Sequence, residues 1–183
     1  MGSVCMISIM SSVLFHIFDG AVAKPLVKDQ VLFRNGDRVR SMYLVIEGTI
    51  ELVRHTQTGA RLVLMRASAG QVFAEASAYA QAYHCDGIAV CDAVVRVMSV
   101  ADFHAQLDAD QEAAHVWAET LAHGLQSARM SSEIRTLRTV SQRLEAWLGV
   151  HGNLPPKGKL QGLAQELGVT REALYRELSK SRR

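Results

Sequence analysis

Residues 160–178 of the chain read Leu160-Gln-Gly-Leu-Ala-Gln-Glu-Leu-Gly-Val-Thr-Arg-Glu-Ala-Leu-Tyr-Arg-Glu-Leu178. Apolar residues recur at three- and four-residue steps on both sides of Gly168, which predicts two short amphipathic helices around a glycine turn. Glycine enters left-handed backbone conformations without steric cost, and the Thr170 hydroxyl can cap the second helix by accepting from unpaired amides. The stretch therefore has the pattern of a helix-turn-helix.

Each predicted helix has an apolar side that we expect to be buried, formed by Leu160, Leu163, Ala164, Leu167, Leu174 and Leu178. The second helix and its cap also carry polar and charged residues suited to DNA: Thr170, Arg171, Glu172, Tyr175, Arg176, Ser179 and Lys180. A guanidinium can bind O6 and N7 of guanine with two parallel bonds, and a carboxylate can accept from N4 of cytosine. These residues form the predicted DNA-binding surface. The alternative is a charged helical hairpin whose polar face only meets water.

Charge is distributed unevenly along the chain. Residues 129–183 carry eleven Lys or Arg and five Asp or Glu, a net charge of +6, whereas residues 1–128 carry nine and thirteen, a net charge of −4. A basic end with a helix-turn-helix is the electrostatic pattern of phosphate binding. The predicted partner is therefore double-stranded DNA, and the acidic part must have another task.

Length and composition narrow the class of protein. A chain of 183 residues allows two small domains with a modest core in each. Its three cysteines, Cys5, Cys85 and Cys91, show no C-x-x-C spacing, which argues against a disulfide framework or a zinc ribbon and predicts a cytoplasmic protein. The apolar residues 1–18 lack a basic leader and are too short to span a bilayer, so they predict an early helix packed on the core and no membrane partner. A misassigned start at Met1 is the alternative.

The middle of the chain alternates in the manner of antiparallel strands. Short runs rich in Val, Ile, Leu and Met predict strands at Val31–Phe33, Met42–Ile46, Thr49–Val53, Leu62–Met65 and Val94–Met98. The breaks between them contain Gly36, Gly48, Gly59 and Gly70. This spacing predicts a small antiparallel β-roll, followed by a short helix over 101–107. We expect an effector-sensing domain over residues 1–108.

A long helix is predicted to follow from residue 110 to residue 137. At about 1.5 Å per residue it is roughly 40 Å long, which exceeds what one small domain covers. Its apolar stripe therefore predicts a parallel homodimer through Trp117, Leu121, Gly124, Leu125 and Ala128. The alternative is that the stripe packs on its own roll. A further helix over 137–150, with Val140, Leu144, Trp147 and Leu148 as its buried side, leads to a break at 152–156. The predicted class is α+β, with a dimerisation helix over 109–137 and a DNA-binding domain over 138–183.

Two motifs resemble the CRP/FNR family of bacterial transcription regulators, and the order of parts agrees over nearly the whole chain. Leu32-Phe-Arg-Asn-Gly-Asp-Arg-Val-Arg-Ser-Met-Tyr-Leu-Val-Ile-Glu-Gly-Thr-Ile-Glu-Leu52 is similar to the family's LF-x-x-GD-x4-LYLV-x-x-G-x-V-x-L, and Thr170-Arg-Glu-Ala-Leu-Tyr-Arg176 to its S/T-R-E-x-x-x-R. The resemblance implies a cyclic-nucleotide-binding-like roll, a homodimer on a palindromic operator, and base reading by Arg171, Glu172 and Arg176. RNA polymerase is a further partner consistent with such a regulator.

A third stretch, residues 70–89, resembles the family's phosphate-binding cassette, and we call it the cassette. Glu75 keeps the position that holds a ribose hydroxyl in cyclic-nucleotide binders, whereas Ala74 replaces a glycine and Cys85-Asp86 replaces Arg-Ser or Arg-Thr. An aspartate there places a like charge beside a phosphate, so a cyclic-nucleotide ligand is disfavoured. The predicted effector pocket comprises Ala74, Glu75, His84, Cys85 and Asp86, and its effector is unidentified.

Residues 84–86 form the densest run of potential ligands in the chain. On a strand His84 and Asp86 point one way and Cys85 the other, so the three cannot simply close on one metal, and no metal site is predicted. The simplest interpretation is a buried cysteine and a structural histidine. Haem is a sharper alternative, because a carbon-monoxide sensor of this family binds it through about this part of the roll. Oxidation of the Cys85 thiol is the third interpretation.

Other functions have weaker support in the sequence. The chain lacks the H-x-H of metal-dependent cupins and also G-x-S-x-G, H-E-x-x-H, G-x-G-x-x-G and a Walker loop, so no enzyme is predicted. The family follows its reading helix with a two-stranded wing, while this sequence stops at Arg183. We therefore expect weakened DNA binding, offset in part by phosphate contacts of Lys157, Lys159, Lys180, Arg182 and Arg183. The alternative function is a ligand-sensing dimer that has lost DNA binding.

Overall fold

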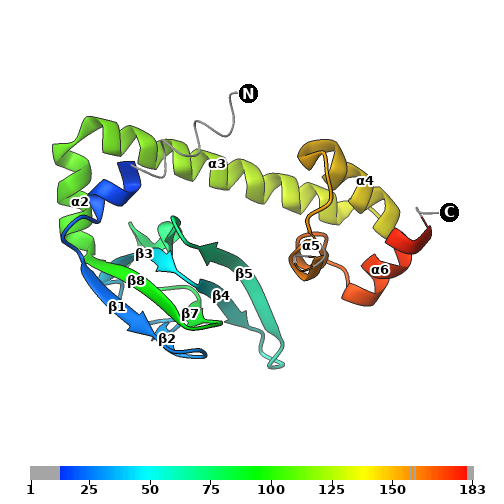
Figure 1. Cartoon of the computed structure of the whole chain (residues 1–183), viewed down its shortest axis with the longest axis horizontal. Helices are drawn as coiled ribbons and strands as arrows, with labels where there is room; N and C mark the ends of the chain where they lie inside the picture. The colour runs from blue at the N-terminus through cyan, green and yellow to red at the C-terminus, as the bar shows by residue number, and fades with distance from the viewer. Residues whose placement is uncertain (1–12, 157, 159, 181–183) are drawn as a thin grey trace. The chain divides into compact units, whose positions relative to one another are not determined.

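The computed structural model describes residues 13–156, 158 and 160–180 (Figure 1). The chain divides into two compact units, Met1–Leu121 and Ala122–Arg183, and the division falls inside helix α3 (Gln111–Thr136). Four of the residues predicted to contact phosphate lie outside the described residues, namely Lys157, Lys159, Arg182 and Arg183. None of the helices in the described ranges combines the length and apolar character that a membrane crossing requires.

The first unit contains an antiparallel β-roll, as the alternation of the sequence predicts. Within the described residues its strands are β1 (Val22–Leu26), β2 (Val31–Phe33), β3 (Ser41–Glu47), β4 (Thr49–His55), β5 (Arg61–Ser68), β6 (Val72–Phe73), β7 (Asp86–Ala89) and β8 (Ala93–Ser99). One sheet has the order β1-β8-β3-β6 and the other β2-β7-β4-β5, with antiparallel neighbours throughout. The strand prediction is thus confirmed for β2, β3, β4, β5 and β8, and it missed β1, β6 and β7.

The core of the roll lies between the two sheets. Four aromatic side chains, Phe33, Tyr43, Phe73 and Tyr83, stack there, and the ring centroids of Phe33 and Tyr83 are 3.8 Å apart. A Cβ atom on Gly87 would lie 2.7 Å from the Phe33 ring, so the strand β7 can pass this stack only with glycine at that position. Tight packing of this kind fixes the positions of β2 and β7, on which the cassette depends.

A second core in the first unit lies outside the roll. Residues 13–17 are helical, and Leu14, Ile17 and Phe18 are buried against α2 (Val100–Ala109) and the first part of α3. This confirms the predicted early helix for residues 13–17; residues 1–12 lie outside the described residues. The Trp117 ring meets Phe103 edge to face, with centroids 5.0 Å apart. The start of α3 is therefore attached to the roll by burial of large side chains.

The second unit is helical. It consists of the rest of α3 with α4 (Val140–His151), α5 (Leu160–Glu166) and α6 (Arg171–Lys180). Most of the residues predicted to face its core are confirmed there: Leu144, Trp147, Leu160, Leu163, Ala164, Leu167 and Leu174 are buried, with Leu148 and Leu178 packed against them. Val140 is the exception, because it is only half-buried and does not belong to this core. The predicted start of the fourth helix at Leu137 is wrong, because Thr139 and Gln142 form a capping box and α4 begins at Val140.

Candidate functional site

The turn between α5 and α6 has the geometry that the sequence predicts. Gly168 adopts a φ of +64°, a left-handed conformation in which a side chain is strained. The Thr170 hydroxyl accepts a hydrogen bond from the Ala173 amide at 3.2 Å, so it caps α6. Leu174 is fully buried and Leu178 packs against the same core, which turns the opposite side of α6 outward.

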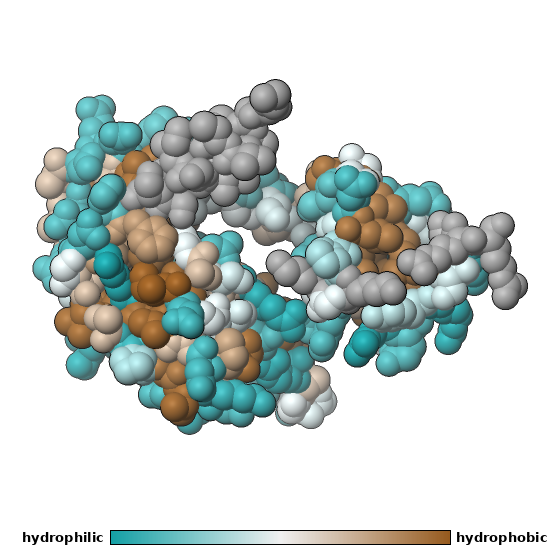
Figure 2. All heavy atoms as spheres, in the orientation of Figure 1, coloured by the Kyte–Doolittle hydropathy of each residue, from teal (hydrophilic) through white to brown (hydrophobic). Residues whose placement is uncertain are grey.

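That outward side, which we call the reading face, carries the predicted DNA-binding residues. Tyr175 is 38% exposed, and the remaining members, Arg171, Glu172, Arg176, Ser179 and Lys180, are exposed as well. Figure 2 shows mainly hydrophilic residues over α6. The structure therefore brings these six side chains onto one helix, with Thr170 immediately before it. Whether they bind DNA stays a prediction.

Contacts within the reading face constrain its side chains to different degrees. The Arg171 guanidinium lies 5.3 Å from the Tyr175 ring centroid, in cation–π range. The Ser179 hydroxyl donates to the Tyr175 carbonyl, and the Lys180 ammonium lies 3.3 Å from a Glu177 carboxylate oxygen. Arg176 has no ion pair or side-chain hydrogen bond within the described part of the chain. Its guanidinium is therefore the one on α6 that is least committed to an intramolecular partner.

Glu172 is held as a carboxylate at the amino end of α6. Hydrogen bonds from its own backbone amide and from the Thr170 hydroxyl hold the pKa of this carboxyl below its usual value. A carboxylate near the first turn also meets the positive end of the helix dipole. Glu172 therefore presents an acceptor, which is the chemistry needed to receive a hydrogen bond from a base.

Two arginines that sequence reasoning missed hold the turn in place. Arg135, at the end of α3, donates to the Gln165 and Glu166 carbonyls at 3.2 and 3.0 Å. Arg143, on α4, donates to the Leu137, Leu167 and Gly168 carbonyls at 2.8, 3.0 and 3.3 Å. We call this pair the turn clamp. Its donors bond to carbonyls at the end of α5 and in the turn after it, where a helix leaves carbonyls to other donors, so the turn clamp ties this turn to both α3 and α4.

The residues predicted to form a dimer interface are divided by the structure. Trp117 is only 3% exposed because it belongs to the core of the first unit, and Leu121 packs partly against that core. Gly124, Leu125 and Ala128 are exposed, Leu125 by 52%. The alternative, in which the stripe packs on its own roll, thus holds for Trp117 and Leu121. Self-association through Gly124, Leu125 and Ala128 stays a prediction.

In the cassette, the first two predicted effector residues stand at a buried turn. Ala74 is buried with a φ of +60°, the conformation that explains why a glycine is usual there, and Glu75 begins the short 3-10 helix η1 (Glu75–Ser77). One Glu75 carboxylate oxygen is buried without a hydrogen-bond partner among the described residues. Burial raises the pKa of Glu75, although its backbone hydrogen bond and His84 oppose the rise. Glu75 therefore has unused hydrogen-bonding capacity.

The other three effector residues alternate in exposure, as predicted. Cys85 is buried, His84 is exposed and Asp86, the first residue of β7, is half-buried. Burial raises the pKa of the Cys85 thiol and outweighs the opposing effect of Arg54, so the reactive thiolate is disfavoured. Arg54 donates twice to the His84 carbonyl, at 2.9 and 3.0 Å. Among the described residues, no group of three or more His, Cys, Asp or Glu side chains is arranged to hold a metal ion.

Asp86 has a structural role. One of its carboxylate oxygens accepts from the backbone N–H of Asn35 at 2.7 Å, and the other lies 3.5 Å from Nδ1 of His55. The carboxylate is therefore already bonded to the turn between β2 and β3. A phosphate placed beside it would meet a negative charge that this turn keeps in position.

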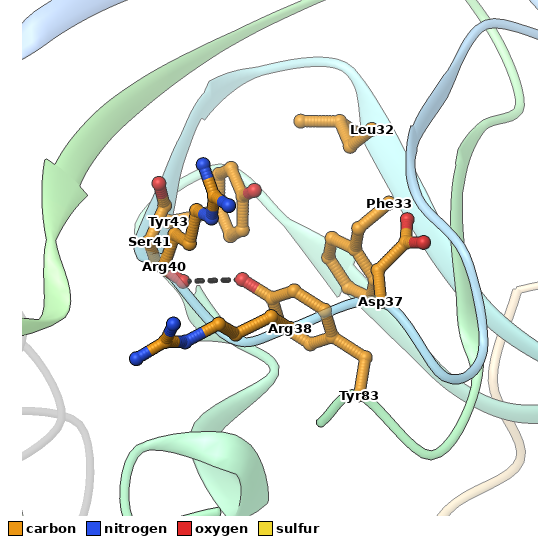
Figure 3. Close-up of a pocket in the computed structure, with 8 residues that line it drawn as sticks. All are labelled: Leu32, Phe33, Asp37, Arg38, Arg40, Ser41, Tyr43 and Tyr83. Carbon is orange, nitrogen blue, oxygen red and sulfur yellow. Dashed lines mark hydrogen bonds between the residues drawn. The ribbon is translucent and has the colours of Figure 1, made fainter. Parts of the chain in front are cut away.

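A separate hollow opens in the roll (Figure 3). It has a volume of about 370 Å³ and is lined by Leu32, Phe33, Asp37, Arg38, Arg40, Ser41, Tyr43 and Tyr83. None of the five predicted effector residues lines it. The sequence did not predict this hollow, because its walls come from two segments some forty residues apart. The one local feature that pointed to it is that Arg38 and Arg40 stand close in sequence to the aromatic Tyr43.

The matching family model covers the roll and its neighbouring helix, residues 23–110. The region is thus similar to a cyclic nucleotide-binding domain. That name denotes a fold family, and the altered residues 74, 85 and 86 lie inside the domain. No curated protein sequence matches the chain.

Solved structures extend the likeness to the second unit. FixK2 from Bradyrhizobium japonicum is similar with a TM-score of 0.69 and 19% identity, over 87% of this chain and 83% of that one. The c-di-GMP responsive global regulator CLP of Xanthomonas campestris is similar with a TM-score of 0.68 and 17% identity, over 94% and 91%. A CRP family transcriptional regulator from Thermus thermophilus, TTHB099, has a TM-score of 0.60 and 19% identity, over 87% and 84%. The roll and the helices after it thus share the fold of these proteins.

Proposed function

We propose that this protein is a DNA-binding transcription regulator of the CRP/FNR type. In this proposal a homodimer reads a palindromic operator through the recognition helix predicted over residues 170–181 of each copy, under the control of an effector in the roll. The observation that carries it is the reading face, where Arg171 and Arg176 are exposed on a helix-turn-helix whose apolar side is buried. The names of the structural neighbours are those of regulators, which also favours a role without catalysis.

The reading-face residues have distinct proposed roles. Arg176 and Arg171 bind guanine edges, and Glu172 accepts from cytosine; each good bidentate pair discriminates by about 1–3 kcal/mol. Tyr175 orients Arg171 through the cation–π contact. Thr170, Ser179 and Lys180 contact the phosphate backbone, which sets the register without reading sequence.

The arrangement of parts follows from the same proposal. Residues 1–108 sense the effector, 109–137 dimerise and 138–183 bind DNA. The exposed Gly124, Leu125 and Ala128 would pair α3 with its copy and set two reading helices about 34–36 Å apart, one turn of DNA. The effector would contact Ala74, Glu75, His84, Cys85 and Asp86. The unpartnered Glu75 oxygen supports a ligand that donates a hydrogen bond there.

A second candidate function is a ligand-sensing dimer with weak or lost DNA binding. It is favoured by the charge of α6, where Glu172 and Glu177 offset two of the three cations and Lys180 is already close to Glu177. A helix with so small a net charge gains little from phosphate contacts.

Selection of bound fragments from random duplex DNA by the full-length protein separates the two functions. A regulator is expected to enrich a palindrome whose half-site centres lie about 10–10.5 base pairs apart. Enrichment of no sequence, at low ionic strength and in the presence of candidate effectors, would contradict the proposal and leave the sensor function.

A further inference from the structure

The hollow in the roll is built from two segments that are bonded to each other along the backbone. The Gly36 and Val39 amides donate to the Tyr83 and Gln81 carbonyls at 2.7 and 2.9 Å, and the Tyr83 amide donates to the Asp37 carbonyl at 2.9 Å. These bonds fix the positions of residues 36–39 relative to 81–83. The hollow is thus a formed feature of the roll, and its volume lies within the range of about 300–1,000 Å³ that is usual for small-molecule sites.

Its rim is positively charged. Arg38 and Arg40 are exposed, and neither makes an ion pair or a side-chain hydrogen bond with any described residue. Figure 3 shows both guanidinium groups on the side of the hollow where Ser41 lies. Asp37 is the one acidic lining residue, and its carboxylate already accepts from the Arg34 amide at 2.8 Å. Two free guanidiniums beside one occupied carboxylate favour an anionic ligand.

Its floor is aromatic and uncharged. Phe33, Tyr43 and Tyr83 are almost fully buried and stack on one another, so the floor is rigid. The Tyr83 hydroxyl donates to the Ser41 carbonyl at 2.7 Å, and burial together with the neighbouring Tyr83 raises the pKa of Tyr43. The Tyr43 phenol is therefore neutral and adds no negative charge that would repel an anion.

We propose that this hollow binds a small aromatic carboxylate, with its carboxylate on Arg38 and Arg40 and its ring toward Leu32, Phe33 and Tyr83. Planar guanidiniums match a planar carboxylate, and aromatic edges and faces favour contact with another ring. The site lies apart from the five cassette residues, so it goes beyond the effector pocket of the proposed function. It is connected to them because Tyr83 is followed directly by His84 and Cys85, and because Asp86 bonds to Asn35.

The test uses 4-fluorobenzoate as a probe, with fluorine NMR of the full-length protein and no DNA. The wild-type protein is expected to broaden the probe signal saturably, and the uncharged 4-fluorobenzamide is expected to bind at least ten times more weakly. The double substitution Arg38→Gln with Arg40→Gln should weaken binding of the acid at least tenfold. Arg34→Gln is the matched control, because Arg34 is exposed on the same segment but does not line the hollow.

Four results would overturn the proposal: no saturable binding, equal binding to the double variant, equal binding of the amide, or displacement by inorganic phosphate as effective as by benzoate. The last would assign the site to any small anion. Melting temperatures of the three proteins show whether the exposed substitutions leave the fold intact. The NMR experiment contains no DNA, so a failure to bind the probe would not contradict the proposed DNA binding by α6. Conversely, a failure of the fragment selection would not contradict binding of the probe in the hollow.

Discussion

Replacing Arg143 by methionine is expected to destabilise the helix-turn-helix. The substitution keeps most of the apolar stem and removes hydrogen bonds to the Leu137, Leu167 and Gly168 carbonyls. A hydrogen bond from a charged donor contributes about 1.5–3 kcal/mol, but the longest of the three is weak and water can replace part of the rest. We therefore expect the free energy of unfolding of the second unit to fall by about 2–3 kcal/mol.

The two tryptophans of the chain allow this to be measured unit by unit, because Trp117 belongs to the core of the first unit and Trp147 to that of the second. In a Trp117→Phe background, urea unfolding followed by Trp147 fluorescence reports on the second unit. With a slope of roughly 1 kcal/mol per molar urea, the midpoint should fall by about 2–3 M. Arg138→Met is the control, since Arg138 makes no side-chain hydrogen bond or ion pair with described residues. Equal midpoints for the two variants would refute the role of the turn clamp.

Three further substitutions test other parts of the structure. Gly48→Ala should lower the free energy of unfolding, measured by thermal denaturation, by at least about 2 kcal/mol. The reason is that Gly48 has a φ of +83° and that the new Cβ would lie 2.5 Å from the Asp92 carbonyl oxygen. A loss below about 0.5 kcal/mol, the size of an ordinary surface change, would contradict this prediction. Burial alone would raise the pKa of Glu51, but hydrogen bonds from Arg61 and Arg66 outweigh burial and lower this pKa. The Glu51 carboxylate therefore stabilises the fold at pH values above the ordinary pKa of 4.5, and this stabilisation is lost as the pH falls through the lowered pKa. Glu51→Gln should therefore reduce stability by about 1–3 kcal/mol at neutral pH and flatten the acid limb of a stability–pH curve. An unchanged limb would exclude these two ion pairs as its source. Leu125→Asp should abolish self-association in sedimentation experiments without lowering the melting temperature, because Leu125 is 52% exposed; a variant that remains dimeric would remove this part of α3 from the interface.

Periodicity predicted the strands whose residues alternate strongly and missed those that do not. β1 contains Lys24 and Pro25, β6 has only two residues, and β7 begins Asp86-Gly87, so none shows a run of β-branched or aromatic residues. These strands form because neighbours in the sheet complete their hydrogen bonding, which a local pattern does not contain. The sequence contains the Thr139–Gln142 capping box that marks the start of α4. The predicted start was nevertheless placed at Leu137, because the apolar stripe continues through that residue.

The candidate site was predictable where it depends on one helix and not where it depends on contacts distant in sequence. The reading face follows from spacing along α6 alone. Arg135 and Arg143 reach carbonyls 24–31 residues away, and the hollow joins Arg38 to Tyr83, so neither could be read from local periodicity. Trp117 shows a further limit, because an apolar stripe does not reveal whether its own roll or a second copy covers it.

The proposed reading of DNA by α6 is tested most directly by the ratio of affinities for a selected duplex and for random duplex DNA, measured for the wild-type protein and for Arg176→Ala. Lys180→Ala serves as the comparison, because a phosphate contact should weaken both affinities alike. We expect Arg176→Ala to lower this ratio about 5- to 150-fold, equivalent to the roughly 1–3 kcal/mol of a base contact, while Lys180→Ala leaves it unchanged. An equal loss of affinity on both duplexes for Arg176→Ala would contradict it.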